Sequence, residues 1–155
     1  MSKETTMRYM LIMRSTPEAE QAMENVDFDE IIAAMGRYNE ELIKAGVMLA
    51  GEGLTDPEEG FVVDFNSDPP VTTDGPYTEA KELFNGFWIL DVSSKEEAKQ
   101  WAQKCPLGPG VKLEVRRVSD TEEFDTSNEW IQKEIQWRAD LAEKVARQAR
   151  EAANR

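Results

Sequence analysis

A stiff turn near the middle of the chain carries the side chains best suited to chemistry. Asp74, Gly75 and Pro76 cannot lie inside a helix or a central strand, because glycine loosens the backbone and proline fixes φ and lacks a donor. A carboxylate whose pKa is raised by burial or by a neighbouring like charge can act as a general acid or base. We therefore expect Asp74, or Glu52 between its two glycines, to take a proton from a small substrate. Lys81 would stabilise the developing anion.

The same region offers further candidates for contacts with a ligand. Arg14 and Glu82 add a counter-charge and a carboxylate to the set. A structural role is a strong alternative for each of these groups, because Asp74 can bond to its own turn and Lys81 can be a solvated charge. The sequence leaves both interpretations open. The predicted ligand-binding residues are Asp74, Gly75, Pro76, Glu52, Glu79 and Arg8.

The chain contains no histidine. This excludes imidazole general bases, histidine metal ligands, and Ser-His or Cys-His nucleophile pairs. The sequence also lacks the alternating oxygen ligands of a calcium loop and a glycine-rich phosphate loop before a helix. We expect no metal and no cofactor. Any acid or base must then be a carboxylate, a tyrosine, a lysine or the single thiol of Cys105.

The composition is strongly acidic. With 31 acidic and 18 basic residues the net charge is −13, which repels nucleic-acid phosphates and anionic membrane surfaces. We expect neither as a partner. Cys105 alone cannot form an internal disulfide, and the chain has neither a signal-like segment nor an apolar stretch of the ~18 residues that a membrane span needs. These features predict a cytoplasmic protein.

Hydrophobic spacing predicts a sheet interrupted by two helices. Apolar residues recur at three- and four-residue intervals over about 27–45, where Asp27 can cap the start and Gly46 can close the end. A second helix begins after two overlapping capping boxes at Ser93-Ser94. The segment Glu18–Glu24 is acidic and compatible with a short helix. The predicted strands are Met7–Met13, a strand from Val47 into a glycine-rich loop, Phe61–Phe65 paired with Val71–Thr73, Phe87–Val92 and Leu113–Val115.

This order of elements predicts an α+β sandwich of the ferredoxin-like, split β-α-β type, with a β-hairpin inserted before the third sheet strand. Both helices would cover one face of the sheet. Apolar side chains among Tyr9, Leu11, Phe87 and Ile89 would then lie on the bare face and need cover. Pairing with a second copy is the simplest way to cover them, so we expect a homodimer.

The last part of the chain has a different composition, without glycine or proline and rich in charged residues and alanine. We therefore divide the chain into a core domain at 1–118 and a helical extension at 119–155. The extension should form an amphipathic helix from Ser127 to Ala152, in which Glu134 and Arg138 can pair. This helix can pack on its own domain, on a dimer partner or on a different protein. Its apolar face comprises Trp130, Trp137, Leu141 and Val145.

Several short motifs in the core domain form a specific combination. They are Arg8-Tyr9-Met10, Gly46-Val47 leading to Gly51-Glu52-Gly53-Leu54, Asp74-Gly75-Pro76-Tyr77 with Glu79, Lys81 and Glu82, Gly86, and the segment from Ala102 to Pro106. In these motifs the chain, over about Met7 to Val118, resembles the YCII-related proteins and in particular their DGPF branch, with Tyr77 in place of the usual phenylalanine. The resemblance implies a dimeric ferredoxin-like fold, the dimeric α+β barrel type.

The resemblance implies less about activity. The YCII branch is proposed to use a His-Asp pair, and the histidine of that pair has no counterpart in this chain. DGPF-branch proteins often accompany or join extracytoplasmic-function sigma factors. Two functions therefore stay open: a homodimer that binds a small organic molecule in an acidic pocket, with or without cofactor-free acid/base chemistry, or a non-catalytic interaction or regulatory module that uses the sheet face and the C-terminal helix. Convergence of Glu52, Asp74 and Lys81 around one pocket would favour the first.

Overall fold

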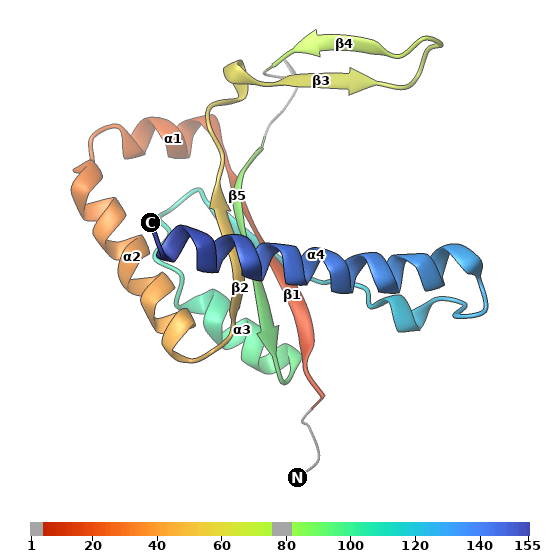
Figure 1. The fold of residues 1–155 in the computed structure, drawn as a ribbon. Helices are drawn as coiled ribbons and strands as arrows, with labels where there is room; N and C mark the ends of the chain where they lie inside the picture. Colours follow the sequence, from red (N-terminus) through yellow and green to blue (C-terminus); the bar gives the residue numbers. More distant parts are fainter. Residues whose placement is uncertain (1–4, 76–81) are drawn as a thin grey trace. The chain divides into compact units, whose positions relative to one another are not determined.

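The chain folds around a four-stranded antiparallel sheet in a computed structural model, which describes residues 5–75 and 82–155 (Figure 1). The strands lie in the order β2-β5-β1-β6. The two central strands carry the longest apolar runs of the sheet, because each is flanked by a neighbour on both edges. The bounds are β1 Met7–Ser15, β2 Met48–Gly53, β5 Leu83–Val92 and β6 Lys112–Arg117.

Helices connect strands that run in the same direction. Two helices, α1 (Pro17–Met23) and α2 (Phe28–Lys44), join β1 to β2, which lies parallel to β1 on the far side of β5. One helix, α3 (Lys95–Gln103), joins β5 to β6, which lies beyond β1. The chain is therefore a mixed α/β protein with an antiparallel sheet and, among the described residues, four α-helices.

The helix ends lie where the capping residues predict them. The Asp27 carboxylate accepts a hydrogen bond from the Asp29 amide at 3.0 Å and begins α2, and Gly46 ends it with a left-handed φ of 73°. At α3, the Ser94 hydroxyl accepts from the Glu97 amide, while the Glu97 carboxylate accepts from the backbone and hydroxyl of Ser93. The Ser93 hydroxyl bond lowers the pKa of Glu97 below its usual value.

The core lies on the sheet face that α2 and α3 cover. Tyr38 on α2 packs edge-on against Trp88 on β5, with ring centroids 5.6 Å apart, and the Trp88 indole donates to Asn39 at 2.8 Å. Tyr9 and Leu11 belong to this core and are buried. Of the four candidates for the bare face, Tyr9 and Leu11 thus lie on the covered face. Successive strand residues point to opposite faces, and the apolar run of β1 supplies apolar side chains to both.

The opposite sheet face carries the alternate residues. Met10 lies beside Ile89, and Ile12 beside Phe87, as cross-strand pairs of β1 and β5. All four side chains are half-buried. Because α2 and α3 pack on the Tyr9 side, neither of these helices covers this apolar strip, which we call the open face.

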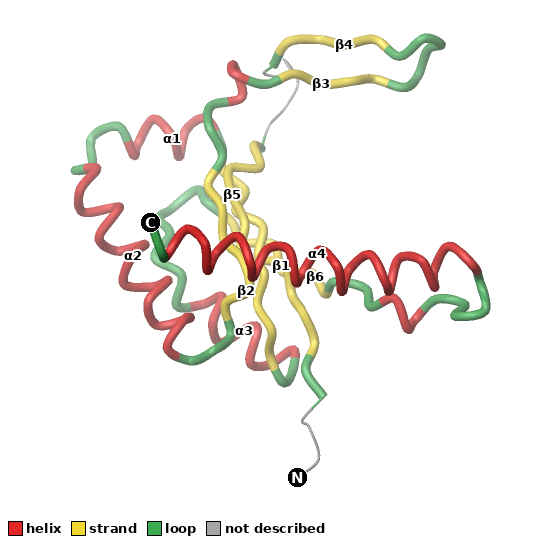
Figure 2. Tube along the Cα trace, in the orientation of Figure 1, coloured by secondary structure: helices red, strands yellow, loops and turns green. Residues whose placement is uncertain are grey.

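The inserted hairpin forms as expected. Strands β3 (Phe61–Asp64) and β4 (Val71–Asp74) pair with each other and not with the main sheet, and a short 3₁₀ turn, η1 (Pro57–Glu59), precedes them. Figure 2 shows the hairpin extending beyond the end of the four-stranded sheet. Every residue of β3 and β4 except Asp64 is exposed.

By its internal contacts the chain forms two compact units, Met1–Val118 and Ser119–Arg155. The second unit holds a 3₁₀ turn, η2 (Thr121–Glu123), and helix α4 (Glu129–Ala153), whose N-cap is Asn128. The pairing predicted on this helix is confirmed, with the Arg138 guanidinium 3.0 Å from the Glu134 carboxylate. The apolar face of α4 is largely exposed and comprises Trp130, Trp137, Leu141 and Val145. Among the described helices, none has the length and apolar composition that crossing a bilayer requires.

The glycine pair Gly53 and Gly86, opposite each other on β2 and β5, allows a matched test of strand packing. A Cβ at Gly86 would lie 2.9 Å from the Glu52 carbonyl oxygen, whereas a Cβ at Gly53 would meet nothing within 4 Å. We expect Gly86→Ala to lower the free energy of unfolding by about 1–3 kcal/mol, because the strands must separate to admit the methyl group. Gly53→Ala should cost much less. Urea denaturation of both variants measures the difference, and equal losses would contradict the close approach at Gly86.

Candidate functional site

A large cavity opens where the end of the sheet meets α1 and the start of α2. Its volume is about 740 Å³. The sheet contributes residues at the end of β1 and the start of β5, and the loop after α3 completes the wall. We call it the α1–α2 cavity. Its lining includes Met13, Ser15, Glu20, Met23, Glu24, Val26, Phe28, Glu30, Ile31, Ala34, Met35, Asp56, Asn85, Leu107 and Val111.

Most of this lining is apolar, and the spacing of α2 explains why. Phe28, Ile31 and Met35 recur at three- and four-residue intervals, so they share one face of the helix and present it to the cavity. Met13 approaches from β1. A cavity with such walls can hold the hydrocarbon part of a ligand.

Two polar residues on the sheet line the same cavity. Ser15 ends β1, is only 5% exposed, and donates a long hydrogen bond of 3.4 Å to the Thr16 carbonyl. Asn85 lies at an irregularity of β5, because the pairing with β1 steps from Gly86 directly to Phe84. The Asn85 amide donates to the Glu20 carboxylate on α1 at 2.6 Å and so joins helix to strand.

Four carboxylates also line the α1–α2 cavity. They come from α1, the segment after it, the first turn of α2 and the loop before η1, and no lysine or arginine is among the described lining residues. The local field therefore favours a cation or a hydrogen-bond donor over an anion. The four are Glu20, Glu24, Glu30 and Asp56.

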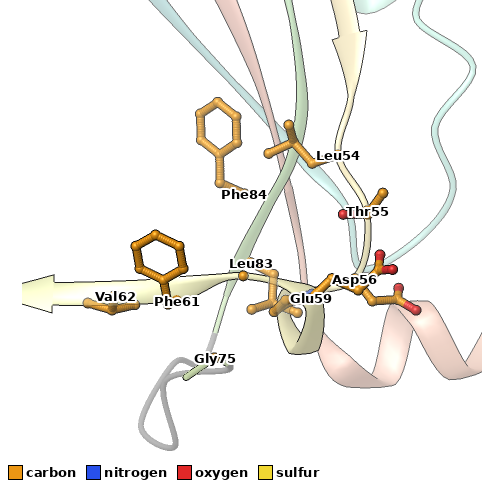
Figure 3. Close-up of a pocket in the computed structure, with 11 residues that line it drawn as sticks. Leu54, Thr55, Asp56, Glu59, Phe61, Val62, Gly75, Leu83 and Phe84 are labelled. Atoms are coloured by element: carbon orange, nitrogen blue, oxygen red, sulfur yellow. The ribbon is translucent and has the colours of Figure 1, made fainter. Parts of the chain in front are cut away.

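A smaller cavity, of about 320 Å³, lies at the base of the hairpin (Figure 3). The rings of Phe61 and Phe84 and the side chain of Leu54 line it, together with Gly75. The Gly75 amide donates to the Gly60 carbonyl at 3.0 Å, which joins the residue after β4 to the residue before β3. The glycine-rich segment 51–53 continues β2 and does not form the loop that the sequence predicts, because its residues pair with β5. Leu54, the residue after this segment, lines the cavity. Asp56 lines both this cavity and the α1–α2 cavity.

The structure does not bring Glu52 and Asp74, the described members of the predicted catalytic set, to one cavity. Glu52 is exposed on β2 opposite Phe87, and Asp74 is exposed at the end of β4 opposite Phe61, so the two lie on different sheets. Neither is among the residues that line the two cavities. Their catalytic and ligand-binding roles stay predictions.

The other predicted contacts divide into two groups. Arg8 is half-buried on β1 in register with Asp91, and Gly75 lines the hairpin-base cavity. Both keep their ligand-binding roles as predictions. The predicted roles of Pro76, Glu79 and Lys81 fall on residues outside the part of the chain that the structure describes.

The additional charges Arg14 and Glu82 pair with each other. Arg14 also bonds to Glu114 on β6 at 2.7 Å, and Lys112 lies 3.4 Å from Glu82. This chain of ion pairs ties β1 to β6 and to the start of β5. The structural interpretation therefore accounts for both residues.

Sequence reasoning missed the residues that form the larger cavity. Glu20, Ser15 and Asn85 carry no motif. The acidic composition of Glu18–Glu24, directly after an apolar strand, was the available signal. It could not show that a bulge in β5 brings Asn85 to the same helix.

A third cavity, of about 410 Å³, lies between α3 and the β1–β6 edge. Lys95 and Lys99 line it together with Tyr9, Leu113 and Val115, and no described carboxylate does. Its charge is opposite to that of the α1–α2 cavity. The two cavities of one domain thus favour ligands of opposite charge.

The domain also holds a buried phenol, Tyr38, and a half-buried thiol, Cys105. The Tyr38 hydroxyl donates to the Trp101 carbonyl at 2.9 Å, and burial raises the pKa of this phenol far above its usual value. Burial likewise raises the pKa of the Cys105 thiol to about 12, although its hydrogen bond with Tyr38 acts in the opposite direction. Neither group is poised as a nucleophile or base near neutral pH.

Cys105 should therefore resist thiol reagents in the folded protein. At pH 8 the thiolate fraction of a thiol with a pKa of about 12 is roughly a thousandfold below that of a thiol with a pKa near 9. We expect labelling with a disulfide reagent to be slower by at least about a hundredfold in buffer than in denaturant, and to accelerate as the pH rises. Absorbance of the released thiol measures both rates. Fast labelling of the folded protein at pH 8 would contradict this account of the thiol.

Residues 7–122 match the family model of the YCII-related domain, a range that includes both sheets, α1 to α3 and the lining of all three cavities. The chain therefore belongs to the YCII-related family. A search of curated proteins finds no match.

Proposed function

We propose that this YCII-related chain binds a small organic molecule in the α1–α2 cavity. The observation that carries the proposal is the combination, in one cavity of about 740 Å³, of apolar walls with a few convergent polar groups, Ser15, Glu20 and Asn85. Ligand sites in proteins have volumes of about 300–1,000 Å³ and this mixture of lining residues. The cavity is acidic, but its carboxylates are not Glu52, Asp74 or Glu79, the ones that the sequence analysis assigns to the binding pocket.

Cofactor-free acid/base chemistry is the accompanying hypothesis. Asp56 lines both the α1–α2 cavity and the cavity at the hairpin base, which Gly75 also lines. A ligand that extended past Asp56 would approach Gly75, the neighbour of Asp74 in the chain. We therefore keep two predictions with this proposal. Asp74 or Glu52 would accept the proton, and Lys81 would stabilise the anion.

The finer fold assignment belongs to the same proposal. Two β-α-β units interleave so that β5 separates β1 from β2 and β1 separates β5 from β6. This interleaving supports the ferredoxin-like, split β-α-β type. The narrower assignment to the DGPF branch depends on the Asp74–Tyr77 tetrapeptide.

A matched pair of substitutions on α2 tests the location of the ligand. Ala34 lines the α1–α2 cavity, whereas its neighbour Ala33 is exposed and does not. In a thermal-shift screen of metabolites, we expect ligands to raise the melting temperature of the native chain and of Ala33→Phe. Ala34→Phe should lose most of that rise, because the ring occupies the volume that the ligand needs. Retention of full ligand affinity by Ala34→Phe, measured by calorimetry, would remove the α1–α2 cavity as the site.

The open face supports a homodimer. Met10, Ile12, Phe87 and Ile89 form a contiguous apolar strip that α2 and α3 leave uncovered, and a second copy of the same strip would bury it. Two faces that present the same strip can pair about a twofold axis.

We expect the native chain to have about twice the mass of the 17.6-kDa monomer in light scattering at micromolar concentration. Ile12→Lys should shift the mass to that of the monomer, because it places a charge in the apolar strip. Ile32→Lys is the matched control, since Ile32 is already 54% exposed on α2. A native monomer at these concentrations, or a dimer unaffected by Ile12→Lys, would contradict an interface on the open face.

The alternative function, an interaction or regulatory module, has one observation in its favour. Along α4, four large apolar residues are each more than half exposed and lie on one face. Such a stripe is typical of helices that dock on another protein surface. This function needs no ligand in the cavity, so a metabolite screen without any hit would favour it. The four residues are Trp130, Trp137, Leu141 and Val145.

A further inference from the structure

We propose that the ligand of the α1–α2 cavity is an amphipathic organic cation, an apolar body that carries one protonated amine. This inference rests on the proposed small-molecule function and adds the chemical class of the ligand. It follows from the charge of the lining, from the exposed apolar rim and from the way in which Glu20 is held.

The charge of the residues that line the cavity predicts the charge of the ligand. Glu20, Glu24, Glu30 and Asp56 approach the cavity from both of its helices and from the loop before η1. Within the described residues, none of the four forms an ion pair with a lysine or arginine of the chain. Four carboxylates without a described counter-charge give the lining a net negative charge, which attracts a cation.

The acidity of the chain as a whole does not explain this arrangement. The cavity between α3 and the β1–β6 edge, in the same domain, is lined by two lysines and no described carboxylate. A uniform acidic background would place carboxylates at both cavities. The difference between the two indicates a local preference for positive charge at the α1–α2 cavity.

Exposed apolar residues at the rim of the cavity indicate that the ligand has an apolar body. Phe28 is 69% exposed, and Val26 and Met23 are 43% and 37% exposed, although all three line the cavity. A polar cation would leave these side chains in water. A hydrocarbon or aromatic body against them would remove apolar surface from water, at about 25 cal/mol per Å².

Glu20 is the group placed to receive the amine. Asn85 donates to its Oε1 at 2.6 Å, and this bond fixes the direction of a half-buried carboxylate. Glu20 lines the cavity, and the bond from Asn85 occupies only one of its oxygens, whereas a carboxylate accepts several hydrogen bonds at once. A charge-assisted bond from an ammonium group to an oriented carboxylate is stronger than a bond between neutral groups.

Three probes of the same shape test the class of ligand. We choose 4-phenylbutylamine, 4-phenylbutanol and 4-phenylbutyrate, which share the apolar body and differ in the charge of the head group. By calorimetry in 50 mM salt, the amine should bind about tenfold more tightly than the alcohol, and the carboxylate most weakly. In 500 mM salt the advantage of the amine should shrink, because salt screens exposed charges. Ala34→Phe should weaken the binding of both the amine and the alcohol.

Charge-neutralising variants assign the effect to the cavity. Glu20→Gln and Glu30→Gln should each weaken the binding of the amine by about two- to fivefold and change the binding of the alcohol less, because only the amine carries a charge. Glu96→Gln is the matched control, because Glu96 is an exposed carboxylate of the same domain that lines none of the three cavities. Circular dichroism checks that each variant keeps its fold. An equal effect of Glu96→Gln on the amine would mean that overall charge, and not the cavity, attracts it.

The outcomes separate this inference from the proposed function. Equal binding of the amine and the alcohol, or tighter binding of the carboxylate, would overturn the cationic class while leaving small-molecule binding in place. The same holds if the amine fails to bind at millimolar concentration and the metabolite screen finds only neutral or anionic ligands. If the screen finds no ligand of any charge, the proposed function itself fails.

Discussion

The antiparallel pairing of β1 with β5 is the constraint on which the rest of the structure depends. It fixes which residues of the two central strands face α2 and α3 and which form the open face. The pairing is regular from Met7 opposite Val92 to Met13 opposite Gly86 and then skips Asn85. The regularly paired residues build the core. Asn85, which has no partner on β1, donates a side-chain hydrogen bond to Glu20 on α1.

The candidate site is a consequence of that step. Because Asn85 holds Glu20, the short helix α1 is bonded to the sheet at the point where β1 ends in Ser15. The apolar face of α2 then closes the cavity from the other side. The same domain thus combines a packed core under the centre of the sheet with a hollow at its end, where ligand-sized space remains.

Local signals in the sequence were sufficient to predict the helices and strands but not the residues of the candidate site. The bounds of α2 could be predicted from Asp27 and Gly46, and the hairpin from the alternating residues after Phe61, because caps and turns act over a few residues. The face of Tyr9 and Leu11 could not be predicted, since an apolar run without polar alternation fits either face. Glu20 and Asn85 are 65 residues apart and meet only through the register of the sheet.

Methionine is unusually frequent in the α1–α2 cavity, where Met13, Met23 and Met35 come from three different elements. An unbranched thioether side chain has three rotatable bonds and adapts to many contours. The walls can therefore fit apolar bodies of several shapes, and the carboxylates, not the outline of the hollow, would decide which molecules are retained. The same thioethers expose the site to peroxide: conversion to sulfoxides would make these walls polar and weaken their hold on hydrocarbon.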